Sequence, residues 1–310
     1  MAHIRPEKYI WLDGKLVPWN ESHVHFLTHS LHYGLAAFEG IRAYEQHSPA
    51  QTAAIFRLTE HVNRLFDSCK LCFIDPPYTR EQVAAACIEI IRANNLVACY
   101  LRPLVFLGDG SMGLGAMDPP VRVGISAYVW GRYLGDEGFS QGIRAKFSSF
   151  TRNNMQVGLP KGKICGQYVN SVLAKREVLK AGYDEALMLD GSGMVAEATG
   201  ENVFAVVRGT LVTPPVSAAI LDGITRDSVL TLARDLGLCV QETPIARDQL
   251  LLADEVFLTG TAAEVTPVRE VDDRPIGAGK PGPITQRLQK AFFEATQGHA
   301  HAYSRWLTPV

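Results

Sequence analysis

The sequence predicts an α+β protein of about two domains, and three features of the chain carry this prediction. The chain has 310 residues, of which 47% are hydrophobic. At roughly 100–200 residues per domain, this length is typical of about two domains with substantial cores. Strand-like segments come first, two helical segments follow, and strands then return. A glycine-rich and charged stretch at 131–138 has the composition of a linker.

The first elements are expected to be strands. Residues 10–17 predict a β-hairpin, because apolar residues flank Asp13 and Gly14, a pair suited to the positive φ of a tight turn. A second strand pair is expected to end within 37–44. Apolar side chains then recur at helical spacing, which predicts an amphipathic helix over 59–71.

A second helix and two strands complete the first unit. Thr79 and Gln82 form a capping-box pattern, which predicts that a helix begins there. The runs 99–107 and 121–130 are rich in β-forming residues and are separated by a loop rich in Gly and Pro. We therefore expect a small N-terminal domain at 1–128.

After an interdomain loop at 129–138, residues 139–310 are expected to form a larger domain. Gly182 is expected to end the first helix of this domain. The predicted strands cover 143–150, 186–189 and a hairpin at 203–212, and the predicted helices cover 166–180, 225–237 and 285–296. This order indicates a mixed barrel or sandwich with helices outside.

The charge balance excludes a global attraction to nucleic acid or to an anionic membrane. The chain carries 30 Lys and Arg against 32 Asp and Glu, for a net charge of −2. Any affinity for a phosphate or a carboxylate must therefore come from a local site.

Three other features of the sequence predict a cytoplasmic protein. No stretch approaches the roughly 20 apolar residues of a membrane span, and the first residues lack the apolar core of a signal peptide. The six cysteines do not form a dense framework, and several lie in apolar patterns typical of buried thiols in a reducing compartment.

Gly108, Gly110 and Gly113 match a dinucleotide-binding pattern that follows a predicted strand. The pattern binds a pyrophosphate only when a helix opens directly after it. Here the chain continues through Pro119 and Pro120 into another strand. We therefore expect a flexible glycine-rich loop and no nicotinamide site.

Two groups of potential metal ligands are also incomplete. His23, His25, His29 and His32 lie close together in the sequence, and Cys69 and Cys72 form a single pair. Structural zinc needs four protein ligands, and neither group has nearby partners that would complete such a set. We expect ordinary packing for both groups and no metal.

Two lysines, Lys161 and Lys163, precede a predicted helix. The positive end of the helix dipole disfavours a charged lysine. A lysine must be neutral to attack a carbonyl, so this placement is compatible with a Schiff-base lysine. A solvated pair on a surface loop is the structural alternative.

Three further segments favour a cofactor site. Glu197 lies among small residues, unlike a surface acid among lysines. The segment 221–226 opens a helix with glycine and threonine, and 259–264 is a second turn with small and hydroxyl residues. Such turns offer free backbone N–H groups to a phosphate. A lysine, an acid and two anion-binding turns together are typical of a pyridoxal-phosphate site.

At these residues the chain resembles the branched-chain aminotransferases, in the D-alanine-aminotransferase-like class (fold type IV) of pyridoxal-phosphate enzymes. The resemblance covers nearly the whole chain. It implies a small N-terminal α/β domain and a larger barrel-like C-terminal domain, joined by the interdomain loop. The matching stretches are 32–34, 38–42, 100–104, 197–202, 223–226 and 260–264.

The resemblance implies pyridoxal 5′-phosphate as the cofactor and also names its ligands. Lys163 would bind it as a Schiff base and carry the proton during the reaction. Tyr168 would hydrogen-bond its phenolic oxygen, and Glu197 would keep its ring nitrogen protonated. The phosphate would be held by Arg64, Gly223, Ile224, Thr225 and Thr261.

The resemblance also implies a substrate pocket. Gly40 would allow substrate to approach the backbone, Arg102 would help to bind the distal carboxylate of glutamate, and Leu114 would reach into the pocket of a neighbouring subunit. The apolar wall would consist of Tyr33, Phe38, Trp130 and Tyr133. The remaining substrate contacts, including those to the α-carboxylate, would come from Arg42, Tyr100, Thr261 and Ala262.

Several of these residues also have a purely structural interpretation. Arg64 could be a solvated partner of Glu60 or Asp67 on its helix, and the aromatic residues could simply pack in a core. Four residues also depart from the family pattern, and they bear on substrate preference more than on cofactor chemistry. These departures are Arg132, Asp222 and the pair Ile164-Cys165.

The predicted function is transfer of an amino group between L-leucine, L-isoleucine or L-valine and 2-oxoglutarate. The expected partners are these amino acids and 2-oxo acids, in a homodimer or higher homo-oligomer with pockets completed across the dimer interface. Alternatives within the same fold are D-amino-acid aminotransferase, (R)-amine transaminase and aminodeoxychorismate lyase. An alternative from another class is a non-catalytic metal-binding or cofactor-binding protein.

Overall fold

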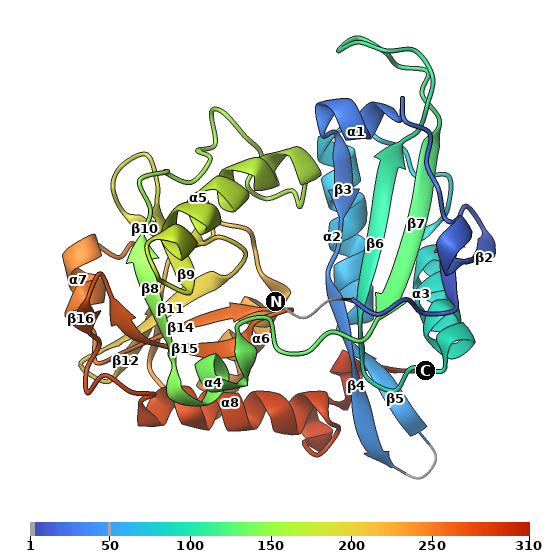
Figure 1. Cartoon of the computed structure of the whole chain (residues 1–310). Coiled ribbons are helices and arrows are strands. Elements are labelled where there is room, and N and C mark those ends of the chain that lie inside the picture. Colours follow the sequence, from blue (N-terminus) through green and yellow to red (C-terminus); the bar gives the residue numbers. More distant parts are fainter. Residues whose placement is uncertain (1–3, 49–50) are drawn as a thin grey trace. The chain divides into compact units, whose positions relative to one another are not determined.

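Two β-sheets organise the chain, and each belongs to its own unit (Figure 1). The computed structural model describes residues 4–48 and 51–310. The first unit comprises Met1–Gly131, Gly162–Gln167 and Ala295–Val310, and the second comprises Arg132–Lys161 and Tyr168–Glu294. The presence of both sheets and helices confirms the predicted α+β class, whereas the predicted domain limits of 1–128, 129–138 and 139–310 stay a prediction.

The first unit contains an eight-stranded sheet in the order β17-β5-β4-β6-β7-β1-β2, with β3 paired to β6. All of its pairings are antiparallel. The strands are β1 (Tyr9–Leu12), β2 (Lys15–Pro18), β3 (Ala36–Phe38), β4 (Ile41–Ser48), β5 (Gln51–Phe56), β6 (Cys99–Leu107), β7 (Val121–Tyr128) and β17 (Leu307–Pro309).

Two long helices, α2 (Leu58–Leu71) and α3 (Arg80–Asn94), pack against this sheet. Leu65, Ile90 and Leu101 are fully buried in the core that they form with it. The helical stripe predicted from the sequence is therefore the face of α2 that enters the core. The short helices of this unit are η1 (Trp19–Glu21), α1 (His29–Tyr33), η2 (Cys165–Gln167) and η3 (His301–Trp306).

Local sequence signals in this unit are confirmed. Asp13 and Gly14 adopt φ values of 47° and 86° in the turn between β1 and β2. Thr79 and Gln82 form the predicted capping box at the start of α3. β6 leads into β7 without a helix between them, so the glycine pattern at 108–113 lacks the context of a dinucleotide site.

The second unit contains a nine-stranded mixed sheet in the order β10-β9-β8-β15-β14-β11-β12-β13, with β16 paired to β15. Strand β8 is parallel to both of its neighbours. The strands are β8 (Ile143–Phe147), β9 (Glu185–Leu189), β10 (Val195–Ala198), β11 (Asn202–Val207), β12 (Thr210–Thr213), β13 (Val240–Glu242), β14 (Glu255–Gly260), β15 (Glu264–Val271) and β16 (Arg274–Pro275).

Five helices accompany the second sheet. α5 packs beside β8 and β9, and α6 packs beside β13 and β14. The helices are α4 (Gly135–Gln141), α5 (Tyr168–Lys180), α6 (Ile224–Asp235), α7 (Arg247–Leu251) and α8 (Pro283–Thr296). Among the described residues no helix has both the length and the apolar character that crossing a membrane requires.

The predicted linker at 131–138 is wrong in its second half, because α4 begins at Gly135. An ion pair between Arg132 and Asp136, with its atoms 2.6 Å apart, supports the start of this short helix. Phe139 then packs edge-on against Phe293, with ring centroids 5.5 Å apart. These are tertiary contacts, and they outweigh the local composition.

Two predicted strands are too long. The strand predicted at 121–130 ends at Tyr128, and that predicted at 143–150 ends at Phe147. Beyond Phe147 the Ser148 amide still donates to the Leu187 carbonyl of β9 at 2.9 Å, while the Ser148 hydroxyl and the Ser149 amide donate to the Glu177 carboxylate. The short elements α1, α7, β10, β13 and β16 have no counterpart among the elements predicted from the sequence.

Candidate functional site

The Lys163 segment is held in the first unit by backbone hydrogen bonds. The Phe38 amide donates to the Lys163 carbonyl at 3.0 Å, and the Lys163 amide donates to Ser68 Oγ at 2.9 Å. Gly166 donates to the Gly34 carbonyl at 2.9 Å. Lys163 itself is half-buried, and its Nζ lies 5.0 Å from the centroid of the Phe38 ring. β3 and α2 therefore fix the backbone from which this amine projects.

The neighbouring Lys161 has a different environment in the second unit. Its Nζ donates to the carbonyl oxygens of Val216, Ala218 and Ile220. Lys161 therefore ties down the loop before α6. Lys161 is exposed and Lys163 is half-buried, so the two lysines have different environments.

Arg102 lies among the aromatic residues near Lys163. Its guanidinium carbon is 4.9 Å from the Phe38 ring centroid and 5.4 Å from that of Tyr100. The Tyr100 ring also meets Trp130 edge-on, with centroids 4.8 Å apart. A Cβ atom on Gly40 would stand 1.9 Å from the Tyr100 hydroxyl oxygen, so only glycine leaves that hydroxyl in place. The first unit thus brings these predicted substrate contacts together.

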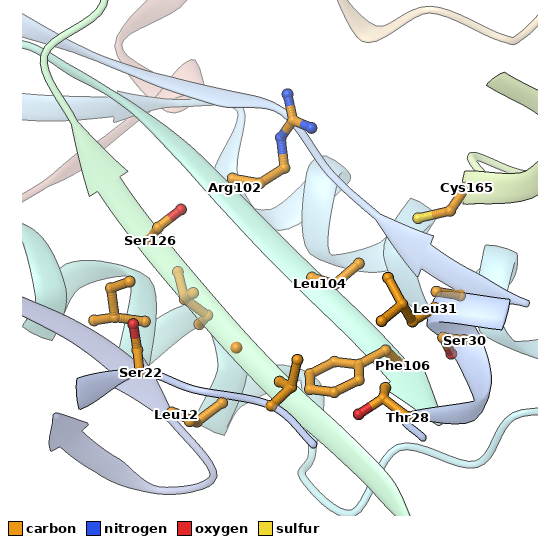
Figure 2. A pocket seen from close by; sticks show the side chains of 15 residues that line it. Leu12, Ser22, Thr28, Ser30, Leu31, Arg102, Leu104, Phe106, Ser126 and Cys165 are labelled. Atoms are coloured by element: carbon orange, nitrogen blue, oxygen red, sulfur yellow. The ribbon is translucent and has the colours of Figure 1, made fainter. Parts of the chain in front are cut away.

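An apolar pocket of about 370 Å³ adjoins this group (Figure 2). Leu104 and Phe106 of β6 line it, and Cys165 from the lysine segment lies at its edge. Among the described residues that line the pocket, Arg102 alone is charged. The pocket therefore offers apolar surface beside one guanidinium group.

Of the other predicted substrate residues of the first unit, Arg42 lies opposite Tyr100 in the pairing of β4 with β6, whereas Tyr33 and Leu114 lie elsewhere. Arg42 Nη2 donates to the Gly131 carbonyl at 3.4 Å. Tyr33 is partly exposed on α1, where its ring lies against that of His29. Leu114 is 90% exposed on the loop between β6 and β7.

Arg64 belongs to a buried cluster that the sequence did not reveal. Its Nε and Nη2 donate to the Glu39 carboxylate at 2.6 and 2.9 Å. His61 Nδ1 lies 2.7 Å from the same carboxylate, which can only accept, so Nδ1 is the donor. The Gly40 amide adds a bond of 3.2 Å. Because the Arg64 side chain is only 13% exposed, the alternative of a solvated arginine is wrong.

The charges of this cluster follow from its partners. Burial would raise the pKa of Glu39, but the charge of Arg64 and the contacts of His61 outweigh it and hold that pKa well below its usual range. Burial also lowers the pKa of His61, against the pull of Glu39. The cluster therefore holds one carboxylate and one guanidinium at neutral pH, with a neutral imidazole.

Glu197 is the centre of a hydrogen-bonded group in the second unit. Arg152 Nε donates to its carboxylate at 2.8 Å, and Asn202 Nδ2 and the Leu221 amide each donate at 3.1 Å. Arg152 is oriented in turn by Ser171, 2.8 Å away. The sequence singled out Glu197 but missed Arg152, which lies 45 residues earlier in a loop without a motif.

The start of α6 is suited to an anion. Ile224 and Thr225 form its first turn, and no side chain caps it. Free amides and the positive end of the helix dipole meet at this point. Gly223 precedes the helix, and a Cβ there would stand 1.9 Å from Asn202 Oδ1. Asn202 therefore links the helix start to Glu197.

Thr261 and Ala262 form the turn after β14. Strand β14 pairs with β11, with Asn202 opposite Thr259, so the turn lies on the strand next to that of Asn202. Thr266 closes the turn by donating its hydroxyl to the Ala263 carbonyl at 2.6 Å. The second unit thus brings together Glu197, the α6 start and this turn.

The last two predicted residues are Tyr133, near the beginning of the second unit, and Tyr168, at the beginning of α5. Tyr168 is half-buried at the first position of α5. The Tyr133 ring centroid lies 5.2 Å from Lys175 Nζ. Among the described residues there is no group of three or more possible metal ligands.

The residues present suit a phosphorylated pyridine aldehyde. The uncapped helix start offers amides to a phosphate, and the lysine amine is held beside an aromatic ring. Glu197 is a buried carboxylate whose orientation is fixed by three donors, as a partner for a protonated ring nitrogen requires.

Comparison with known proteins gives a consistent result. The model of the family described as amino-transferase class IV matches residues 36–271. A branched-chain-amino-acid aminotransferase of Pseudomonas aeruginosa is 48% identical over 301 residues, which are 97% of each chain.

Solved structures are similar over the same length. The crystal structure of an Escherichia coli branched-chain amino acid aminotransferase has a TM-score of 0.94 at 42% identity, over 97% of this chain and 98% of the other. That of a T.th. enzyme of the same name with pyridoxamine 5′-phosphate has a TM-score of 0.94 at 45% identity, over 99% of both chains. A second T.th. structure, with N-(5′-phosphopyridoxyl)-L-glutamate, has a TM-score of 0.91 at 44% identity over 98% of both.

Proposed function

The chain belongs to the amino-transferase class IV family. On that premise we propose which of its residues catalyse the reaction and which bind the cofactor and the substrate. It is a pyridoxal-phosphate-dependent branched-chain-amino-acid aminotransferase with the fold type IV architecture. The observation that carries this conclusion is whole-chain similarity to such enzymes, 48% identity over 97% of each chain.

Lys163 is the proposed catalytic residue. Pyridoxal phosphate, when bound, supplies an electron sink for the substrate's α-carbon. The Lys163 amine would hold the cofactor's aldehyde carbon and, once released, carry the proton removed from substrate. Support comes from its backbone, which β3 and Ser68 hold on both sides.

Other groups are proposed to hold the rest of the cofactor. Glu197 would pair with the ring nitrogen, since Arg152 and Asn202 fix its orientation. Tyr168 would donate to the phenolic oxygen. The phosphate would bind Arg64, Gly223, Ile224, Thr225 and Thr261, a set supported by the uncapped start of α6.

The substrate residues are proposed to divide between apolar and charged contacts. Arg102 would help to bind the distal carboxylate of glutamate by donating hydrogen bonds to it. The position of its guanidinium beside the Phe38 and Tyr100 rings supports this. Gly40 would leave room at the backbone. An apolar wall for the branched side chain would come from Tyr33, Phe38, Trp130 and Tyr133. The other contacts, including those to the α-carboxylate, would come from Arg42, Tyr100, Thr261 and Ala262.

We also propose a homo-oligomer in which the loop carrying Leu114 reaches a second copy. Leu114 and Met117 are 90% and 86% exposed on that loop, so both apolar side chains are available to a second copy. The apolar pocket beside Arg102 is large enough to receive such a side chain. A cytoplasmic location is proposed too, supported by six cysteines that form no disulfide within the described residues.

A transamination panel tests the function. Purified protein with pyridoxal phosphate and 2-oxoglutarate is supplied with L-leucine, D-leucine or the two enantiomers of 1-phenylethylamine, and glutamate is measured. We expect turnover of L-leucine and little turnover of the others. Preference for D-leucine or for the (R)-amine would replace the substrate assignment by one of the alternatives within the fold, and no turnover at all would defeat the proposal.

A further inference from the structure

A second group of buried charges lies in the second unit, on residues that the proposed mechanism does not use. Lys175 of α5 forms an ion pair with Glu185 of β9, and Glu185 is fully buried. Glu201, in the turn between β10 and β11, is 4% exposed. Lys175, Glu185 and Glu201 therefore place two carboxyl groups beside one cation.

Glu185 is the direct ion-pair partner of Lys175, the cation of this group. Besides Lys175, its carboxylate accepts hydrogen bonds from Thr199 Oγ1 at 2.6 Å and from the Ala186 amide at 2.8 Å. Lys175 Nζ also donates a hydrogen bond to the Asp184 carbonyl at 2.6 Å. Lys175 therefore forms its ion pair with Glu185, and its charge only partly offsets the burial of Glu201.

Glu201 lies directly against the turn proposed to bind anions. A Cβ on Gly260 would lie 3.4 Å from Glu201 Cγ and 3.3 Å from the Gly200 carbonyl oxygen. Gly260 immediately precedes Thr261 and Ala262. The Glu201 carboxyl is in turn anchored by the Gly200 amide at 3.0 Å. Glu201 and its own turn therefore form the surface on which the Thr261 turn rests.

We propose that Glu201 is a positioning residue that supports the Thr261 turn as an uncharged acid and weakens anion binding there when it ionises. This inference rests on the proposed function, because Thr261 is placed in the site by that proposal. We expect ionisation of Glu201 to weaken the binding of dicarboxylate substrates, which bring two negative charges to the site.

The electrostatics agree with the geometry. Burial, followed by the charge of Glu185, raises the pKa of Glu201 to about 8, although Lys175 and the Gly200 amide act in the opposite direction. Glu197, with its partner Arg152, is the other charged group that acts on it and also favours the neutral form. From β14, the strand that faces Glu201, Gly260 makes the contact and carries no charge.

The sign of the pH effect follows. At pH values well below 8 the acid is mostly neutral and adds little charge beside the turn. As pH rises through about 8 it ionises, and the carboxylate repels the carboxylates of substrate. The KM for glutamate should therefore rise with pH in a way that the kcat does not share, by about threefold to tenfold for one partly screened charge.

The experiment compares the wild-type holoenzyme with Glu201→Gln, which keeps the side chain's shape but cannot ionise. The KM and kcat for L-glutamate are measured from about pH 6.5 to about pH 9.5, a range that brackets the raised pKa. We expect the alkaline rise in KM to disappear in Glu201→Gln, with little change in the pH dependence of kcat. Glu137→Gln, an exposed position on α4, is the matched control and should keep the wild-type profile.

A second measurement needs no turnover. A group whose folded pKa is raised loses stability as pH rises from its ordinary value of 4.5 to about 8, and the loss is then constant. The Tm of Glu201→Gln should therefore exceed that of the wild type by an amount that grows from about pH 5 to about pH 8. This growth is absent from Glu137→Gln.

The outcomes separate the two proposals. A wild type that fails to transaminate L-leucine defeats the proposed function, whatever the Tm curves show. An active enzyme whose Glu201→Gln variant keeps the alkaline rise in KM overturns the positioning role. Parallel Tm curves for wild type and Glu201→Gln overturn the claim that Glu201 is buried as a neutral acid.

Discussion

Each unit buries a glutamate close to residues proposed to bind anions, but the two glutamates carry opposite charge states. Glu39 is surrounded by Arg64 and His61, and its pKa is held below the usual range. Glu201 shares one lysine with Glu185, and its pKa rises to about 8. Burial raises the pKa in both places, so the number of available cations decides the sign.

The difference gives the two clusters different tasks. Arg64 cannot lose its proton, so the Glu39 cluster is charged throughout the physiological range and holds a guanidinium rigidly in place. The Glu201 cluster can take up or release a proton near pH 8 without breaking its ion pair. The first unit therefore supplies a fixed charge, and the second supplies a charge that depends on pH.

The largest effect should follow from removing the Glu39 charge. Glu39→Gln leaves the Arg64 guanidinium buried without its counter-charge, which costs about 3–5 kcal/mol in comparable ion pairs. The loss should be large at both about pH 5.5 and about pH 8, because neither Glu39 nor Arg64 titrates between them. Denaturant unfolding at both pH values measures it.

A double variant sharpens this test. Adding Arg64→Met to Glu39→Gln removes the unpaired charge and should restore part of the lost stability. If Glu39→Gln alone costs less than about 1 kcal/mol, the carboxylate does not neutralise Arg64 as described.

Removing the single cation of the second cluster should have a smaller effect. Lys175→Met leaves the Glu185 carboxylate buried without its ion-pair partner, which should cost about 2–4 kcal/mol at pH 8. Thr199 and the Ala186 amide still donate to Glu185, which limits the loss. Denaturant unfolding measures it, and a loss as large as that of Glu39→Gln would remove the contrast between the clusters.

The smallest effect should come from His61. His61→Phe removes one neutral donor from Glu39 and should cost about 1–2 kcal/mol at pH 7. The folded pKa of His61 is lowered, so the wild type loses stability as pH falls below the unfolded value of about 6.5. The variant lacks this loss, and the difference between the two proteins should narrow from about pH 7 to about pH 5. A constant difference would mean that folding does not shift the pKa of His61, and a widening one would mean that His61 is charged in the fold.

The sequence predicted those features that depend on nearby residues. The Asp13-Gly14 turn and the Thr79 capping box were readable because each lies within a few positions of the chain. The buried partners of the charged residues could not be predicted from the sequence. Glu39 meets Arg64 across 25 residues, and Glu197 meets Arg152 across 45, with no periodicity connecting them. Such pairs depend on tertiary packing, which composition and spacing do not record.

The same distinction explains the error at α4. Its two glycines, Gly135 and Gly138, lower helix propensity, so the local signal indicated a linker. In the fold, Gly138 is needed, because a Cβ there would lie 2.7 Å from Ile143 Cγ2. The resemblance to a known family supplied the roles of Lys163 and Glu197, which their local sequences alone would not assign.

The proposed role of Lys163 can be tested most directly by locating the cofactor's covalent attachment. The holoenzyme is reduced with borohydride and digested, and the modified peptide is sequenced by mass spectrometry. We expect a pyridoxyl group on Lys163, retained in Lys161→Ala and absent from Lys163→Ala. A group on Lys161, or a Lys163→Ala variant that still transaminates L-leucine at the wild-type rate, would contradict it.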